Sequence, residues 1–168
     1  ALKYKKYKSP LILIGSIKIL NLQIKKLKTK QKIKLLDISR IENYNLNNRS
    51  INLINVDYDQ NKAFKKITNK SNLYIENCFK VAFKLINMKY TDKFINGPIS
   101  KTTFLDKKIL GITEYISNKF FVKKNAMLIY NKDLSVCPLT THLPLKLVIK
   151  SINKKNIFEK VYLINEFY

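Results

Sequence analysis

Three short apolar runs alternate with stretches of helical spacing, and this alternation restricts the fold more than any other feature of the sequence. The runs PLILIG (10–15), KIKLLDI (32–38) and INLINV (51–56) are short and continuous, as is typical of fully buried strands. Between the first two, residues 16–27 place apolar side chains three and four positions apart, with Ser16 at the N-cap position. Strands that alternate with helices predict an α/β fold with a largely parallel sheet flanked by helices.

The strongest helical pattern covers residues 72–90, and Ser71 precedes it as the predicted cap. The sequence that follows predicts a strand-like piece, a turn at Gly97-Pro98 and the start of another helix. One broad apolar face of the 72–90 helix is predicted to consist of Leu73, Ile75, Cys78, Phe79, Ala82, Leu85 and Ile86.

The remaining segments predict one more pair of strands and two more helices. AMLIY (126–130) and LSVCPLTT (134–141) are strand candidates joined by the turn NKD, and two helices are expected over 144–152 and 156–167. The polar, Asn-rich stretch 39–50 is predicted to be a loop, as is the irregular stretch that follows the third apolar run.

The length of 168 residues predicts one α/β unit spanning residues 1–168. Cys78 and Cys137 are isolated within apolar runs, so we expect free thiols in a reducing cytoplasm. No apolar run approaches the roughly 20 residues of a membrane span. Because the sequence begins at Ala1 without a methionine and stops within a helical pattern, we expect a fragment of a longer protein.

The formal net charge of +22 raises the question of a nucleic-acid partner. Nucleic-acid readers favour the bidentate guanidinium of arginine, but this chain has only Arg40 and Arg49. The lysines are scattered along the whole sequence, as expected of solvated surfaces encoded by an AT-rich genome. We therefore expect attraction for phosphorylated ligands and no dedicated nucleic-acid surface.

Two strand-to-helix transitions are candidates for chemistry, because ligands in such sheets bind beyond the carboxyl ends of the strands. In INGPISK (95–101), Gly97 and Pro98 end the strand-like piece, and Ser100 is placed to cap the next helix. The free N–H groups at the start of that helix would then face an anion beside Lys101. An ordinary tight turn before a capped helix explains the same residues.

The second transition, TTHLPL (140–145), contains His142, the only histidine. A helix can begin at Pro144, and an imidazole at this place can bind a metal, exchange protons or form a structural hydrogen bond. A metal site needs three or four ligands, and the acidic residues of the chain form no metal-binding motif. A metal at His142 therefore needs ligands from another subunit or from sequence outside this chain.

In order and spacing, these segments resemble the 4-hydroxythreonine-4-phosphate dehydrogenase (PdxA) family. The family has a G-P-[VI]-x-K turn, a G-H-T-E segment and an A-T-T-H-L-P-L stretch. This chain has GPISK at 97–101, GITE at 111–114 and LTTHLPL at 139–145. The PLILIG strand and the long helix at 72–90 also lie where the family has them.

The resemblance implies part of an isocitrate/isopropylmalate dehydrogenase-like fold, with this chain as the first-domain portion of a longer two-domain enzyme. It also implies NAD- or NADP-dependent oxidation and decarboxylation of 4-phosphohydroxy-L-threonine in pyridoxal 5′-phosphate biosynthesis. The enzyme would be a cytoplasmic homodimer with its active site and a divalent metal (Zn, Mg or Co) at the subunit interface. By this resemblance His142 matches a metal ligand and Thr113 a substrate-binding residue, while Lys101, Ser100 and Gly97 lie in the active-site cleft.

Ile112 stands where the family has a substrate-binding histidine, and isoleucine can neither donate a hydrogen bond nor carry a proton. Ile112 therefore leaves open a dehydrogenase of another phosphorylated hydroxy acid or an inactive relative. The basic composition leaves open a non-catalytic module that binds nucleic acid. The family's other metal and cofactor residues would lie outside this chain, so we expect the chain alone to be inactive.

Overall fold

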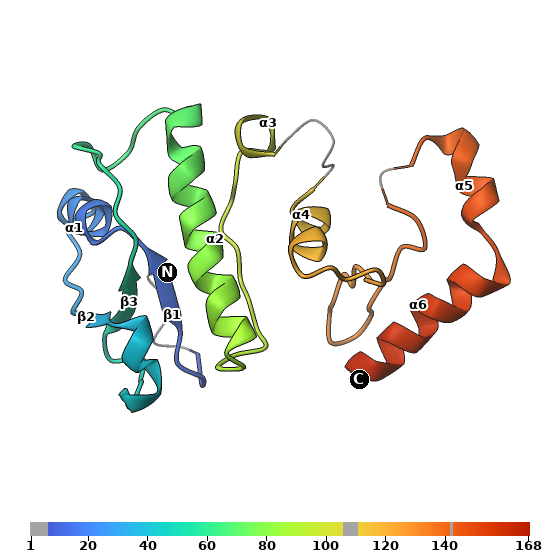
Figure 1. Cartoon of the computed structure of the whole chain (residues 1–168), viewed down its shortest axis with the longest axis horizontal. Helices are drawn as coiled ribbons and strands as arrows, with labels where there is room; N and C mark the ends of the chain where they lie inside the picture. Colours follow the sequence, from blue (N-terminus) through green and yellow to red (C-terminus); the bar gives the residue numbers. More distant parts are fainter. Residues whose placement is uncertain (1–6, 106–110, 142) are drawn as a thin grey trace. The chain divides into compact units, whose positions relative to one another are not determined.

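The computed structural model describes residues 7–105, 111–141 and 143–168 (Figure 1). The chain divides into two compact units, residues 1–104 and residues 105–168. In the described residues, the first unit contains a three-stranded sheet and the second consists of helices joined by irregular segments.

The sheet of the first unit is parallel throughout, as predicted. Its strands are β1 (Ile12–Gly15), β2 (Ile33–Leu36) and β3 (Ile51–Asn55), in the spatial order β1-β3-β2. The register pairs Leu53 of β3 with Leu13 on one side and Leu35 on the other. All three apolar runs thus form strands, and the α/β prediction is confirmed.

Helices lie on both sides of this sheet (Figure 1). One side carries α1 (Ile17–Lys26), which is capped as predicted, because the Ser16 hydroxyl accepts a hydrogen bond from the Ile19 N–H at 3.4 Å. The other side carries α2 (Asn72–Asn87), which corresponds to the strongest helical pattern.

The core between α2 and the sheet is built from four buried residues of four different elements, Leu36, Ile41, Ile54 and Leu85. Ile41 comes from the 3₁₀ segment η2 (Ile38–Asn43), which overlaps the predicted loop 39–50. Asp37 forms this segment's N-cap by accepting a hydrogen bond from the Ser39 N–H. The prediction of a loop is therefore wrong for this segment. The polar composition suggested irregular structure, but the burial of Ile41 and the cap formed by Asp37 give the segment a regular conformation.

Two predictions for α2 are wrong. Ser71 does not cap the helix, because its hydroxyl donates to the Thr68 carbonyl at 2.8 Å within a short 3₁₀ turn, η3 (Asn69–Ser71). Leu73 was expected on the apolar face, but it is 64% exposed, while Phe79, Ala82 and Leu85 are buried.

No strand forms over residues 91–100, although a strand-like piece was predicted there. This segment instead packs against α2 through Phe94, whose ring centroid lies 5.8 Å from that of Phe79 and 6.3 Å from that of Phe83. Aromatic contacts with a helix take the place of pairing with a strand, and a single helical turn, α3 (Lys101–Phe104), follows.

The second unit contains three helices among its described residues. They are α4 (Ile112–Lys119), α5 (Leu145–Ser151) and α6 (Lys154–Phe167). The last two confirm the predicted C-terminal pair, and α5 begins directly after Pro144. Helix α4 was not predicted.

The two strands expected over 126–141 reduce to one antiparallel bridge. Ile129 and Val136 exchange both backbone hydrogen bonds, at 2.8 and 3.0 Å, and the Asn131 side chain accepts from the Asp133 N–H in the turn between them. Both bridge residues are at least half exposed. The turn was thus predicted correctly, but the flanking residues bury too little apolar surface to extend the ladder.

Three helices end in the same strained way. Lys28, Lys89 and Phe121, which follow α1, α2 and α4, have φ values of 50°, 58° and 54°. At each end the next N–H donates back to the last helical turn, a closure that usually places glycine in the left-handed position. The bonds are Thr29 N–H to Ile24 O (3.1 Å), Tyr90 N–H to Leu85 O (3.1 Å) and Val122 N–H to Ser117 O (2.9 Å).

Substitution of Phe121 by glycine should stabilise the protein. The left-handed conformation costs a residue with a β carbon about 1–2 kcal/mol, and the greater freedom of glycine in the unfolded chain offsets about 0.5–1 kcal/mol of that gain. Phe121 is 90% exposed, so its ring contributes little packing. We expect Phe121→Gly to raise the free energy of unfolding in urea by about 0.5–1 kcal/mol relative to Phe121→Ala, which retains the β carbon. Equal stability of the two variants would contradict this explanation.

Candidate active site

The residues predicted to bind substrate divide between the two units. Gly97 and Lys101 belong to the first unit, whereas Ile112 and Thr113 belong to the second. His142 lies outside the described residues.

The Gly97 turn is open and exposed. A β carbon added at Gly97 would meet no atom within 4 Å, and the backbone there is not left-handed. Nothing in the local conformation therefore demands glycine, and an open backbone is accessible to a ligand. The neighbouring Asn96 side chain donates to the Gly97 carbonyl at 3.2 Å.

The helix after this turn is too short for the anion site that the sequence suggested. α3 has four residues, and two of its N–H groups, those of Thr103 and Phe104, donate to the Ser100 carbonyl at 3.3 and 3.0 Å. The Ser100 hydroxyl lies 3.2 Å from the Thr102 hydroxyl. A single turn has little macrodipole, so only Lys101, which is exposed, offers this segment a positive charge for a ligand.

The GITE segment forms the start of α4. Gly111 occupies the N-cap position in an extended conformation, and its carbonyl accepts from the Tyr115 N–H at 3.1 Å. Ile112 is half-buried and Thr113 is exposed, so the threonine hydroxyl is accessible and the isoleucine side chain is partly packed. One oxygen of Glu114 is buried without a hydrogen-bond partner among the described residues.

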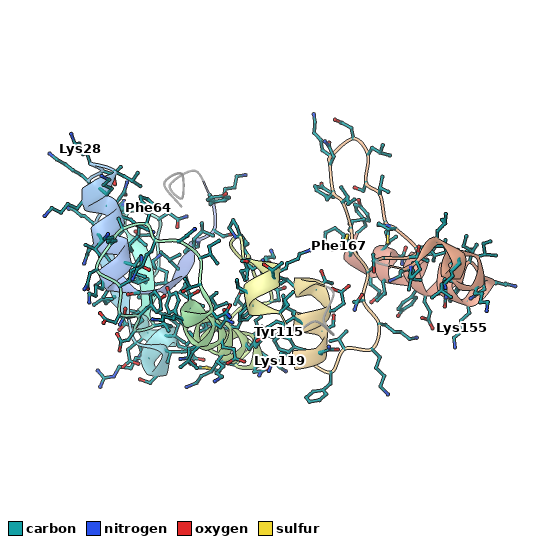
Figure 2. The ribbon with its side chains drawn as sticks, turned by 90° about the horizontal axis from the view of Figure 1, so that it is seen from above. Lys28, Phe64, Tyr115, Lys119, Lys155 and Phe167 are labelled. Carbon is teal, nitrogen blue, oxygen red and sulfur yellow. The ribbon has the colours of Figure 1, made fainter. Side chains whose placement is uncertain are left out.

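Tyr115 is the buried side chain of α4. Lys119, one turn later, places its ammonium group 5.5 Å from the centre of the Tyr115 ring (Figure 2). This cation–π contact and the burial of the ring hold the helix that presents Thr113.

The carboxyl end of β1 is closed by side chains that sequence reasoning did not identify. The Ser16 N–H donates to the Tyr74 hydroxyl at 2.9 Å, and the Ile17 N–H donates to the Asn55 side chain at 2.8 Å. A β carbon on Gly15 would lie only 3.1 Å from the Tyr74 hydroxyl. The start of α1 is thus occupied by its own neighbours and does not present these N–H groups to an anion.

Tyr74 is itself held from two sides. Its ring stacks on Tyr58 with centroids 4.6 Å apart, and Cys78 lies one turn away on the same helix. Burial, with a smaller contribution from Cys78, raises the pKa of Tyr74 to about 12. Burial also raises the pKa of the Cys78 thiol, which therefore stays protonated.

Residues 7–105, 111–141 and 143–168 contain no cluster of three His, Cys, Asp or Glu side chains that could hold a metal ion. In the same ranges no helix is long and apolar enough to cross a membrane. The positive charge is largely unneutralised, since the described residues form three ion pairs, all at exposed or partly exposed positions.

Residues 6–168 match a family model described as "Pyridoxal phosphate biosynthetic protein PdxA". A 4-hydroxythreonine-4-phosphate dehydrogenase of Sulfurihydrogenibium sp. (strain YO3AOP1) is 36% identical over 117 residues, which are 68% of this chain and 35% of the relative. One from Aquifex aeolicus (strain VF5) is 41% identical over 56 residues, which are 33% of this chain and 18% of the relative.

Solved structures of the same fold cover nearly all of the chain. The 4-hydroxythreonine-4-phosphate dehydrogenase of Klebsiella pneumoniae matches with a TM-score of 0.73 and 18% identity, covering 95% of this chain and 49% of that one. The enzyme of Burkholderia phymatum matches with a TM-score of 0.74 and 18% identity, covering 90% and 46%. The chain thus spans about half the length of these structures, and its matches cover 35% and 18% of the two curated relatives.

Removal of the Tyr74 hydroxyl should weaken the fold and change its response to alkali. The folded state keeps this phenol protonated up to a pKa of about 12, whereas the unfolded value is 10.0. The resulting stability is fully present below pH 10 and is lost as the pH rises toward 12. Tyr74→Phe leaves the Ser16 N–H without its acceptor, at a cost of about 1–2 kcal/mol at neutral pH.

Chemical denaturation at a series of pH values tests this expectation. The free energy of unfolding should fall less steeply between pH 10 and 12 in Tyr74→Phe than in the wild type. Tyr7→Phe, which removes an exposed phenol, is the matched control and should follow the wild type. Identical pH profiles for Tyr74→Phe and the wild type would rule out a protonated, buried Tyr74.

Proposed function

The chain belongs to the PdxA family, and we propose that it is the first-domain portion of an NAD- or NADP-dependent 4-hydroxythreonine-4-phosphate dehydrogenase. The reaction would oxidise and decarboxylate 4-phosphohydroxy-L-threonine on the route to pyridoxal 5′-phosphate. The observation that carries the proposal is the family match over residues 6–168, which includes all three motif segments in order. The proposed enzyme acts in the cytoplasm.

Three residues of this chain would contact the substrate. The Lys101 ammonium group, at the surface, suits a phosphate or a carboxylate, which charge-assisted hydrogen bonds hold most strongly. The exposed hydroxyl of Thr113 can donate a further bond. At Gly97 the absence of a side chain leaves room for a ligand to approach the backbone.

We propose His142 as one ligand of a divalent metal (Zn, Mg or Co). The described residues do not supply the remaining ligands, so these would come from the partner subunit or from sequence outside this chain. The same holds for most of the nicotinamide site. We therefore propose a homodimer with the active site at the subunit interface, and we expect no turnover from the 168-residue chain alone.

Ile112 favours a second candidate substrate. The side chain is half-buried and offers neither a donor nor a charge at the place of the family's histidine. An enzyme with this substitution could prefer another phosphorylated hydroxy acid whose binding needs one polar contact fewer. Competition assays with both substrate types, followed by nicotinamide reduction, distinguish the two.

Replacement of Lys101 should impair turnover by the complete gene product. Loss of a charge-assisted hydrogen bond costs about 1.5–3 kcal/mol, so Lys101→Ala should lower kcat/KM about 10- to 100-fold. Lys93→Ala removes an exposed lysine that precedes the Gly97 turn and should leave kcat/KM unchanged. Equal effects of the two substitutions would show that only general charge matters.

Replacement of His142 should act on metal binding first. His142→Ala should weaken metal affinity by about 100-fold or more, as measured by titration of the metal-free protein, and metal-dependent turnover should be lost. Thr141→Ala changes the preceding residue and should keep both properties. Unchanged metal affinity in His142→Ala would refute the proposed role of this histidine.

A further inference from the structure

The segment that follows β3 lies along α1 before the chain reaches α2. The Lys18 ammonium group pairs with Asp59 at 2.5 Å, and farther along the helix the Gln23 side chain donates to the Ala63 carbonyl at 3.2 Å. Lys65 is also close, because Lys18 and, to a smaller extent, Lys65 lower the pKa of the Asp59 carboxyl. This segment is therefore held against α1.

The contact brings two runs of lysine together. Residues 7–36 and 60–75 contain no acidic residue. Lys25 and Lys26 lie in the last turn of α1, where the negative end of the helix dipole accounts for them. The dipole does not account for the other exposed lysines of the two runs, which are Lys28, Lys30, Lys62, Lys65 and Lys66. These seven residues form a lysine patch, and none of them takes part in an ion pair within the part of the chain that the structure describes.

Apolar side chains are exposed within the lysine patch. Leu27 lies one turn beyond Gln23 on the same side of α1, and Phe64 directly follows the residue whose carbonyl Gln23 binds. These two side chains are 49% and 58% exposed, and Ile67, three residues after Phe64, is 67% exposed. Figure 2 shows Phe64 and Lys28 in the same part of the first unit.

An apolar protein surface would cover this patch poorly. Lysine ammonium groups are almost never buried without an opposite charge, so a surface that packed on Leu27, Phe64 and Ile67 would have to desolvate the lysines around them. This holds for a second protein and for another part of a longer chain alike. The lysine patch therefore requires water or a partner with many negative charges, and its apolar side chains require that this partner also have an apolar layer.

We propose that the lysine patch binds the surface of a lipid bilayer that contains anionic phospholipids. The ammonium groups would contact the lipid phosphates, while Leu27, Phe64 and Ile67 would enter the boundary between the headgroups and the acyl chains. Long lysine side chains suit this arrangement, because their stems can lie along apolar surface while the charge stays in water. The protein would lie on the membrane without crossing it.

A nucleic acid offers the phosphates but not the apolar layer. Its bases could stack on Phe64, but they offer little to the aliphatic side chains of Leu27 and Ile67. Nucleic-acid contacts also favour the guanidinium group of arginine, and neither run contains an arginine. The anionic bilayer is therefore the partner that fits both the charged and the apolar side chains.

This inference goes beyond the proposed reaction and does not depend on it. None of the residues of the lysine patch is among those proposed to bind substrate or metal. Absence of dehydrogenase activity would contradict the proposed function alone, whereas failure to bind lipid would contradict the role of the lysine patch alone.

Sedimentation of the complete gene product with lipid vesicles tests the charges. We expect binding to vesicles of equal parts phosphatidylglycerol and phosphatidylcholine, and no binding to phosphatidylcholine alone. Each lysine at an anionic surface contributes about fivefold to the affinity. The triple variant Lys25→Gln, Lys26→Gln and Lys28→Gln should therefore bind about 100-fold more weakly at low salt.

A second triple variant is the matched control for net charge. It carries the same substitution at three exposed lysines of the second unit, Lys146, Lys150 and Lys154. Charges farther than a Debye length from the bilayer are screened, so this variant should bind within about threefold of the wild type. Equal losses in the two triple variants, or a wild type that does not bind the anionic vesicles, would overturn the proposal.

Fluorescence tests the insertion of the apolar side chains. This chain contains no tryptophan, so Phe64→Trp adds an indole to the patch whose emission is measured against the wild type. We expect bromine atoms on the acyl chains of the anionic vesicles to quench this emission. Phe158→Trp, at a side chain that is 69% exposed and outside the patch, is the matched control and should not be quenched. An unquenched Phe64→Trp variant that binds a single-stranded oligonucleotide more tightly than it binds the vesicles would assign the patch to nucleic acid and overturn the proposal.

Discussion

The pairing of β3 with both of its neighbours is the constraint on which the first unit depends. Four consecutive residues of this strand, 51–54, are buried, and one of them, Asn52, carries an amide into the interior. Its Nδ2 donates to the Leu11 carbonyl at 3.0 Å and to the Asn47 carbonyl at 2.9 Å. One side-chain amide therefore holds together the segment that precedes β1 and the segment that precedes β3. A shift of register by one residue would move Asn52 to the α1 side and leave those carbonyls unpaired.

The asparagine next to this site extends the same effect. Asn48 accepts from the Leu11 N–H at 3.0 Å and donates to the carbonyls of Tyr7 and Ser9 at 2.9 and 2.8 Å. The chain that leads into β1 is thus held by side-chain amides in place of a further strand. Buried or partly buried amides with these bonds specify one arrangement, because any other leaves polar groups unsatisfied.

The sequence predicted the elements correctly where every residue of a run is buried. It predicted poorly the residues whose contacts depend on another element or on a competing local hydrogen bond. Runs such as 51–56 identify strands because both faces of a central strand must be apolar. The α1 cap at Ser16 followed from local chemistry alone. Ser71 has the same residue type, but its hydroxyl found a carbonyl within its own turn, a local competition that no pattern reveals. Helix α4 escaped detection because its eight residues are mostly polar and its single buried side chain is Tyr115.

For the candidate site, too, the sequence predicted some features and missed others. The spacing of the three motif segments made Gly97, Lys101 and Thr113 candidates, and the structure leaves all three exposed. Sequence reasoning overestimated the anion site at Ser100, since the length of α3 depends on packing beyond the turn. It did not identify Tyr74. The ring of this residue is packed and its hydroxyl binds the N-terminus of α1, and no sequence pattern marks a tyrosine in that role.

The three left-handed helix ends change how backbone strain should be interpreted in this protein. Strained residues often gather at functional sites, where the strain serves the mechanism. Here Lys28, Lys89 and Phe121 lie in different parts of the chain, and Lys28 projects at the tip of α1 (Figure 2). The chain contains only three glycines, and none of them occupies these positions. Strain is therefore distributed over ordinary helix ends, where fraying relieves it, and the amides of those terminal turns should be the first within their helices to exchange with solvent.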